Sequence, residues 1–170
     1  RDRRAEKRPR PIGDPAARFA EDYLRLLRAV RFTVVLELVM HPDTAAAISA
    51  AAPSAAAISP ERVRDELDRM LREAPRAGDA IRRLDELSLL DILLPEVAAM
   101  KGQAQPPEFH PEGDVFTHTL IMLDRMHQPS RTLAWAVLLH DVGKPPTASC
   151  DGTRIRFNGH ASEGARMAER

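Results

Sequence analysis

The chain has 170 residues, which is enough for one or two small domains with a hydrophobic core, and its formal charge is zero. A single cysteine excludes an internal disulfide, and we expect a cytoplasmic protein because reducing compartments keep thiols free. The most apolar stretch is Ala-rich, is interrupted by Pro53 and is too short to cross a bilayer, so we expect no membrane partner.

A basic segment opens the chain and leads into the first predicted helix. Residues 1–31 carry ten Lys or Arg against five Asp or Glu, a balance that is typical of contact with a polyanion. We predict a helix over about residues 15–32, whose core-facing side carries apolar residues at helical spacing: Phe19, Tyr23, Leu27 and Val30. Charged residues recur on it at every third position: Asp22, Arg25, Arg28 and Arg31. The helix therefore offers one hydrogen-bond acceptor followed by three planar donors.

This order of groups matches particular nucleotide bases. A carboxylate only accepts hydrogen bonds and a guanidinium only donates them, so Asp22 followed by Arg25 complements the amine and ring nitrogen of cytosine and adenine. Guanine and uracil present the reverse order and would leave polar groups unpaired, at about 1–3 kcal/mol each. Glu21 is placed to hold Arg25, while Arg28 and Arg31 are suited to ribose or phosphate. The same spacings also occur in ordinary surface salt bridges, worth about 0.3–0.5 kcal/mol, and this alternative stays open.

Residues 42–90 predict three further helices. Pro42 and Asp43 open a short Ala-rich helix that Pro53 ends, and Ser59 is a suitable N-cap for a helix beginning at Pro60. Another helix is predicted over about residues 79–90. Together with the first helix they predict a shared core that includes Phe19, Leu27, Val30, Val63, Leu67, Leu84 and Leu87.

A Pro- and Gly-rich polar segment at residues 101–114 is the clearest candidate linker. Two strongly apolar helices are predicted after it, over residues 115–126 and 132–141, and we expect them to pack together. Residues 147–158 contain the turn signal Asp151-Gly152 and predict a small hairpin or an irregular loop. Another helix is predicted from His160 onward.

The second half also contains candidate metal ligands. His118 lies on the first of the apolar helices, and His140 and Asp141 lie at the end of the second, which Gly143 is expected to terminate. Imidazole and carboxylate are the usual ligands of divalent transition metals at open sites. The spacing favours a metal site and hydrogen-bonded core histidines about equally, and the role of His160 stays open.

Three segments, taken in order, resemble the class II tRNA nucleotidyltransferase and bacterial poly(A) polymerase family. Residues 12–32 resemble its nucleotide-selecting motif, residues 58–67 its next neck motif, and residues 93–97 a later short motif. By this resemblance the Glu-Asp-x-x-Arg element, Glu21 to Arg25, acts as a protein template for CTP or ATP. Residues 110–120 and 138–145 look like an HD-domain phosphohydrolase module, which implies that His118, His140 and Asp141 bind a divalent transition metal. That pattern closes with a further Asp, for which the sequence holds no plausible candidate.

The resemblance implies an all-α fold, a helical neck and body followed by the start of an α-helical HD domain. We expect residues 1–12 to be a basic lead-in from a missing head domain, 13–100 the neck and body, 101–114 the linker, and 115–170 a C-terminally truncated HD domain. The implied parent is a CCA-adding enzyme that transfers CMP or AMP from CTP or ATP to the 3′ end of tRNA. Its catalytic Mg²⁺ ions would lie in the head, so this chain alone should not polymerise.

The alternatives are a bacterial poly(A) polymerase, a stand-alone HD-domain phosphohydrolase and a helical RNA-binding fragment without catalysis. The HD-like motifs argue against the first, and the ordered neck motifs argue against the second. The sequence does not distinguish CCA addition from CC-only or A-only addition.

Overall fold

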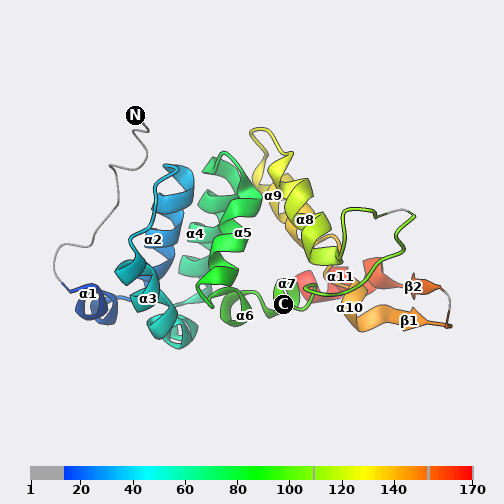
Figure 1. Ribbon diagram of the computed structural model, residues 1–170, viewed down its shortest axis with the longest axis horizontal. Coiled ribbons are helices and arrows are strands. Elements are labelled where there is room, and N and C mark those ends of the chain that lie inside the picture. Colours follow the sequence, from blue (N-terminus) through cyan, green and yellow to red (C-terminus); the bar gives the residue numbers. More distant parts are fainter. Residues whose placement is uncertain (1–13, 109, 153, 170) are drawn as a thin grey trace.

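The computed structural model describes residues 14–108, 110–152 and 154–169, and this part of the chain is helical apart from one two-stranded hairpin. Figure 1 shows the helices following one another along the long axis, with the first helices at one end and the hairpin at the other. The prediction of an all-α protein is confirmed. No helix within the described residues is both long and apolar enough to cross a membrane. The predicted basic lead-in at residues 1–12 lies outside the described residues.

The predicted first helix is two helices, α1 (Pro15–Glu21) and α2 (Leu24–Val35). Asp14 caps α1, because its side chain accepts hydrogen bonds from the backbone N–H groups of Ala16 and Ala17. The chain then becomes extended at Asp22, with φ −159° and ψ 109°, before it turns back into α2. The prediction of one continuous helix over residues 15–32 was therefore wrong. Asp22 stands at the junction of the two helices, so the four charged residues do not form one ladder.

The rest of the first half follows the predicted order. Helix α3 (Pro42–Ala51) runs into a 3₁₀ helix η1 (Ala52–Ala57), and α4 (Pro60–Glu73) begins after Ser59, whose side chain makes no capping hydrogen bond. Helix α5 (Ala77–Glu86) begins two residues earlier than predicted, and two single turns follow, α6 (Leu90–Leu93) and α7 (Pro95–Ala98).

The predicted core of the first half is largely confirmed. Six of its seven named residues are buried, with exposed fractions of 3% or less: Phe19, Leu27, Val30, Leu67, Leu84 and Leu87. Val63 is only half-buried and packs against the edge of this core. The six buried residues come from α1, α2, α4 and the α5 region, so the core joins elements that are far apart in sequence. Side chains of this kind each contribute roughly 1.5–3 kcal/mol when fully buried.

The second half contains the two predicted apolar helices, α8 (Val115–Asp124) and α9 (Arg131–Leu139), packed against each other. A short helix α10 (Lys144–Thr147) leads into the hairpin of β1 (Ala148–Cys150) and β2 (Ile155–Phe157). The strands are antiparallel, with Ser149 opposite Arg156. Helix α11 (His160–Ala168) follows and packs on α10. The structure thus contains the predicted hairpin and the predicted helix from His160.

The segment at residues 101–114 is irregular, as expected of a linker, but it is bonded to the second half. Asp114 accepts hydrogen bonds from the backbone N–H groups of Gly102 and Thr117, at 2.6 and 2.7 Å, and so caps α8. Gln105 is 4% exposed, and its Oε1 accepts a hydrogen bond of 2.6 Å from Lys144. These hydrogen bonds hold the segment against the second half, and we call residues 101–114 the strap.

Contacts also cross between the two halves, mainly where α5 meets α8. Gly78 permits this close approach, because a Cβ there would lie 2.6 Å from the carbonyl oxygen of Leu120. Asp124 on α8 accepts a hydrogen bond from the Gly78 N–H at 2.8 Å, and from Arg76 and Arg82 at 2.8 and 2.9 Å. The two halves are thus joined by a polar network around Asp124, whose side chain is 11% exposed. Their division at residues 101–114 into separate domains stays a prediction.

Candidate functional site

The segment that the sequence suggests as nucleotide-selecting lies at the junction between α1 and α2. The Asp22 carboxylate accepts a hydrogen bond of 3.0 Å from the Leu24 N–H and one of 2.8 Å from Arg62 Nη2 on α4. The bond from Leu24, followed by that from Arg62, lowers the pKa of Asp22, so the group is an ionised acceptor at neutral pH. Its side chain is still 32% exposed.

Arg25, on α2, is held by residues of α1 across the junction. Its Nη1 forms a short ion pair with Glu21 and donates a hydrogen bond of 2.8 Å to the carbonyl oxygen of Arg18. The expected contact between Glu21 and Arg25 is therefore present in the structure. The Arg25 side chain is 35% exposed, so part of the guanidinium remains open to a ligand. Asp22 and Arg25 are each fixed by a neighbour and partly exposed, as a template for a base requires.

Arg28 and Arg31 have a different partner from the one the sequence implied. Both donate to the buried Glu66 on α4, Arg28 at 3.3 Å and Arg31 at 2.6 Å. The Arg28 side chain is 50% exposed, whereas that of Arg31 is only 11% exposed. Arg31 is therefore part of the packing between α2 and α4, and only Arg28 presents a substantial open surface.

Arg62 and Glu66 were missed by the sequence reasoning. They lie four residues apart on α4 and within the second neck-like motif, which was the only local signal. Their significance depends on which helix they face, and that is a tertiary property. Through these two residues, α4 is hydrogen-bonded to three of the four charged positions that the sequence placed on one helix: Asp22, Arg28 and Arg31.

The predicted metal ligands come together in the second half. His118 lies on α8, His140 is the C-cap of α9, and Asp141 follows directly. One ligand atom from each lies within 4.8 Å of the others. Asp141 is nearly buried, with 5% of its side chain exposed, while the side chains of His118 and His140 are 19% and 35% exposed. The nearly buried carboxylate of Asp141 thus lies at the bottom of this cluster, and the two imidazoles are more exposed to solvent.

The electrostatics of this cluster fit a divalent cation. Burial would raise the pKa of Asp141, but hydrogen bonds from His140 and Lys144 outweigh it and lower the value to about 2. Asp141 Oδ2 lies 3.1 Å from His140 Nε2 and 2.7 Å from Lys144 Nζ. Burial would lower the pKa of His140, yet its bond with Asp141 raises it. Two imidazoles and an ionised carboxylate are a suitable donor set for a transition metal, whose charge would replace the His140 proton.

A third imidazole, that of His160, stands beside this cluster. Its Nε2 lies 4.0 Å from Asp141 Oδ1, and its Nδ1 lies 2.9 Å from the carbonyl oxygen of Phe157. Gly143 brings α11 this close, because a Cβ on it would lie 2.0 Å from the carbonyl oxygen of His160. Gly143 was expected to end a helix, but its absent side chain also lets two backbones meet.

Two residues of the strap reach this cluster and were also missed. Glu112 Oε1 lies 2.6 Å from His118 Nδ1, and Gln105 is bonded to Lys144. The sequence placed residues 101–114 in a linker because of their composition, and composition does not reveal where an irregular segment folds back.

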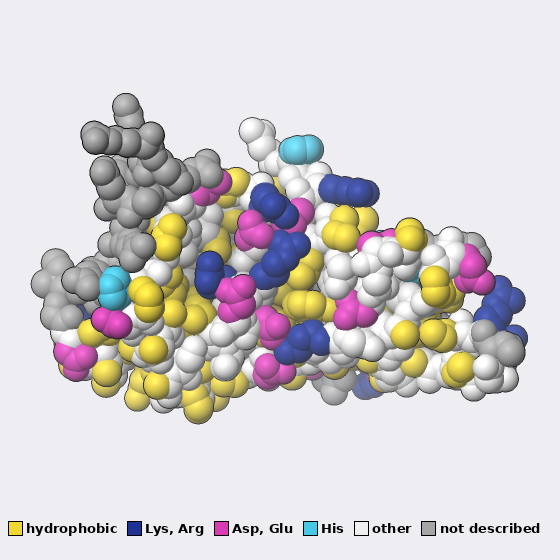
Figure 2. Space-filling view, in the orientation of Figure 1, with side chains coloured by type: hydrophobic (Ala, Val, Ile, Leu, Met, Phe, Trp, Pro, Cys, Tyr) yellow, Lys and Arg dark blue, Asp and Glu magenta, His cyan; other side chains and the backbone are white. Residues whose placement is uncertain are grey.

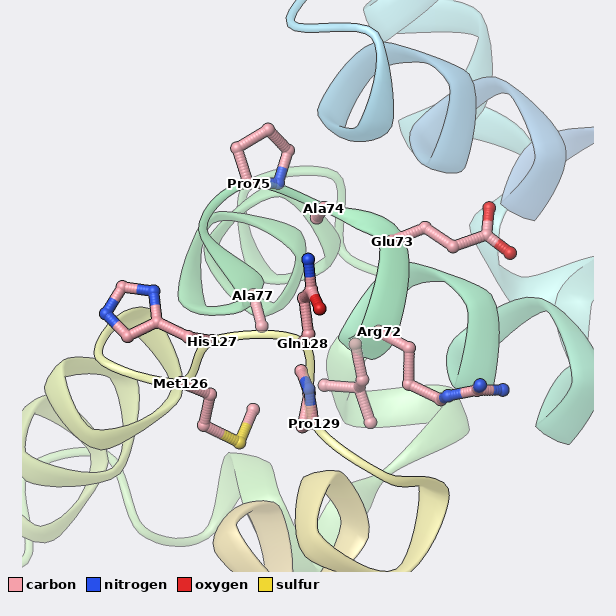
Figure 3. Close-up of a pocket in the computed structure, with 10 residues that line it drawn as sticks. Arg72, Glu73, Ala74, Pro75, Ala77, Met126, His127, Gln128 and Pro129 are labelled. Carbon is pink, nitrogen blue, oxygen red and sulfur yellow. The ribbon is translucent and has the colours of Figure 1, made fainter.

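The surface elsewhere offers less distinctive chemistry. On the face in Figure 2, basic and acidic side chains alternate across the middle of the molecule. Several basic and acidic side chains of α5 and its surroundings form ion pairs: Arg82–Asp79, Arg83–Glu86 and Lys101–Asp85. Figure 3 shows a pocket of about 370 Å³ where Gln128, after α8, points toward Ala74, after α4. This pocket lies at the joint between the halves and shares no lining residue with either candidate site.

Comparison with known proteins covers most of the chain. Residues 37–101 match the family described as "Probable RNA and SrmB- binding site of polymerase A". The chain is 40% identical over 157 residues to the A-adding tRNA nucleotidyltransferase of Deinococcus radiodurans, covering 86% of this chain and 36% of that protein. It is 41% identical over 159 residues to the Multifunctional CCA protein of Halorhodospira halophila, covering 89% of this chain and 38% of that protein. The chain thus spans a little more than a third of the length of these relatives.

Proposed function

Because the chain belongs to the family of class II tRNA nucleotidyltransferases and bacterial poly(A) polymerases, we propose that it helps to build the tRNA 3′ end, by selecting the nucleotide and binding the RNA. CMP or AMP would be transferred from CTP or ATP, with tRNA as the acceptor. The carboxylates that hold the catalytic Mg²⁺ ions would belong to a head domain outside this chain.

The fixed and partly exposed pair of Asp22 and Arg25 is the observation that carries this proposal. The ionised Asp22 would accept a hydrogen bond from an exocyclic amine, and Arg25 would donate one to the neighbouring ring nitrogen of cytosine or adenine. Arg62 and Glu21 hold the two groups in place before the nucleotide arrives, which reduces the entropy lost on binding. Arg28, half exposed, is available for a phosphate.

A chimeric enzyme tests this role of the pair. This chain replaces the matching segment of the Multifunctional CCA protein of Halorhodospira halophila, and incorporation of all four NTPs into tRNA lacking its 3′ end is measured. Asp22→Ala with Arg25→Ala should remove the preference for CTP and ATP over GTP and UTP. Arg64→Ala, at an exposed position on α4, is the control and should leave the preference unchanged. Persistent discrimination in the double variant would refute the template.

The cluster of His118, His140 and Asp141 supports a second activity, a metal-dependent phosphohydrolase. A bound divalent transition metal would supply an activated water and polarise a phosphoryl oxygen. The chain's own residues would hold that ion, while Lys144 compensates the charge of the buried Asp141. Hydrolysis of 2′,3′-cyclic nucleotides to nucleoside monophosphates in the presence of Mn²⁺ tests this activity, and His140→Ala should abolish it. Monophosphate formation that persists in His140→Ala would assign the activity elsewhere.

A further inference from the structure

Glu112 lies between two imidazoles at the edge of the proposed metal site. Its Oε1 is 2.6 Å from His118 Nδ1 and 3.1 Å from His110 Nδ1. The two rings meet edge to face, with their centroids 4.8 Å apart. The side chains of Glu112, His110 and His118 are between 19% and 24% exposed, so water reaches them only in part.

The chemistry of the carboxylate determines where the histidine protons lie. A glutamate side chain is ordinarily ionised at neutral pH, and one oxygen of Glu112 lies within hydrogen-bond distance of both His118 Nδ1 and His110 Nδ1. An ionised carboxylate has no proton to donate, so the nitrogens that it contacts must each carry one. A neutral imidazole with its proton on Nδ1 keeps the lone pair on Nε2, and Nε2 is then the nitrogen that can bind a metal.

We propose that Glu112 is a positioning residue, which fixes the proton of His118 on Nδ1 and so presents Nε2 to the position shared with His140 and Asp141. The proposal rests on the proposed metal site and adds a residue of the strap to it. Glu112 orients the ring and selects its tautomer, but it does not touch the ion.

His140 of the site and the neighbouring His160 use the same arrangement with backbone acceptors. His140 Nδ1 lies 2.8 Å from the carbonyl oxygen of Val137, and His160 Nδ1 lies 2.9 Å from that of Phe157. All three rings therefore donate from Nδ1 and leave Nε2 toward the site. Only for His118 is the acceptor a side chain, which makes this one interaction accessible to mutation.

His110, Glu112 and His118 are themselves close enough to bind an ion, since their ligand atoms lie within 4.8 Å of one another. The 2.6 Å separation of Glu112 Oε1 and His118 Nδ1 argues against this arrangement. Two ligands about 2.1 Å from a tetrahedral metal lie about 3.4 Å apart, whereas 2.6 Å is the length of a charge-assisted hydrogen bond. A proton, rather than an ion, belongs between these atoms.

Nuclear magnetic resonance on the metal-free chain tests the proton position directly. With ¹⁵N-labelled histidine, two-bond correlations at neutral pH distinguish a proton on Nδ1 from one on Nε2. We expect His118 to carry it on Nδ1 in the wild type. In Glu112→Gln the amide both donates and accepts, so this preference should weaken. Glu108→Gln is the matched control, since Glu108 is an exposed glutamate of the same segment.

Calorimetric titration with Mn²⁺ then tests the consequence for the metal. Loss of a group that orients a ligand typically weakens metal binding about 10–100-fold, and we expect this in Glu112→Gln but not in Glu108→Gln. His110→Ala should change the Mn²⁺ affinity little, because the bond between Glu112 and His118 remains. Circular dichroism of each variant confirms that it is folded.

Several results would overturn the proposal. A proton on Nε2 of His118 in the wild type would do so, as would a tautomer and an Mn²⁺ affinity that Glu112→Gln leaves unchanged. An affinity that His110→Ala reduces as much as His140→Ala would place the ion between His110 and His118 instead. If His118 has the expected tautomer but the wild type binds no Mn²⁺, the metal site itself is refuted, while the assignment of the proton stands.

Discussion

Glu66 stabilises the pairing of α2 with α4 through a single carboxylate. It is 5% exposed and accepts hydrogen bonds from both Arg28 and Arg31. A buried acid costs free energy unless it is paired, and here two guanidinium groups pair with it. Arg28 and Arg31 of the proposed nucleotide-selecting segment therefore also take part in the packing of α2 on α4, so we expect substitutions there to affect folding as well as any binding.

The first prediction concerns this carboxylate. Glu66→Gln should lower the free energy of unfolding by about 1–3 kcal/mol, because a neutral amide cannot compensate the largely buried charge of Arg31. Urea unfolding monitored by circular dichroism measures the change. Glu61→Gln, on an exposed part of α4, should stay within about 0.5 kcal/mol of the wild type. Equal losses in the two variants would contradict the role of Glu66.

The second prediction concerns the core. Leu67 is 1% exposed, and Leu67→Ala should cost about 2–5 kcal/mol of unfolding free energy, because it removes buried surface and leaves a cavity. Val63, one turn earlier on α4, is only half-buried, so Val63→Ala should cost clearly less. Thermal and urea unfolding of both variants test this ranking. The opposite order would show that α4 packs with a different face.

At the scale of elements, two close crossings of the backbone depend on glycine. Gly78 lies where α5 crosses α8, and Gly143 lies where the end of α9 meets α11. In both places a Cβ would come closer than 3.0 Å to backbone atoms of another element. These contacts fix how the helix pairs sit, so the placement of His160 beside Asp141 follows from the absence of a side chain at Gly143.

The third prediction tests the crossing of α5 and α8. Gly78→Ala should lower the unfolding free energy by about 1–3 kcal/mol, although alanine favours helices, since the new methyl group collides with the Leu120 carbonyl and with Asp124. Gly164→Ala is the comparison, because its Cβ would meet the Gly143 nitrogen at a less severe 3.3 Å. Differential scanning calorimetry should find the larger loss for Gly78→Ala. A stabilised Gly78→Ala would show that the helices can separate there without cost.

At the scale of the whole molecule, the charge network around Asp124 joins the two halves. Burial would raise the pKa of Asp124, but the hydrogen bonds from Arg76 and Arg82 outweigh it and lower the value below the ordinary 3.8. A lowered pKa in the folded state means that the unfolded state binds the proton more readily. The contribution of Asp124 is therefore complete above the unfolded pKa and is lost as the pH falls through the folded pKa.

The fourth prediction follows from this sign. The unfolding free energy of the wild type should exceed that of Asp124→Asn by a constant amount between pH 7 and about pH 5, and the difference should shrink below about pH 4. Urea unfolding across this pH range measures the difference between the two proteins. Asp68, which pairs with Arg131 and Arg72, is present in both, so its own contribution to the pH dependence cancels in that difference. A difference that stays constant to pH 2 would show that the pKa of Asp124 is the same in the folded and unfolded states, and would contradict this prediction.

The order of the elements and most of the core could be predicted from the sequence, whereas the roles of the two groups of candidate site residues stay predictions. Apolar spacing located α4, α8 and α9, proline and glycine marked helix ends, and Asp-Gly marked the hairpin. These are local signals, since the period of a helix and the chemistry of a turn depend only on neighbouring residues. The convergence of His118 with His140 and Asp141 was also anticipated, because two strongly apolar helices must bury their faces together.

Only the tertiary structure decided which distant groups hold these residues. The break at Asp22, the pairing of Arg31 with Glu66, and the contacts of Arg62 and Glu112 join positions whose spacing carries no periodic signal. Helical periodicity continued through Asp22, yet its side chain bonds to the Leu24 N–H and to Arg62, and these contacts accompany the extended backbone. The sequence by itself determined which candidate groups are present and on which helices they lie, because these are local properties. The packing of the helices and of residues 101–114 determined the orientation and partners of these groups, because these depend on distant residues.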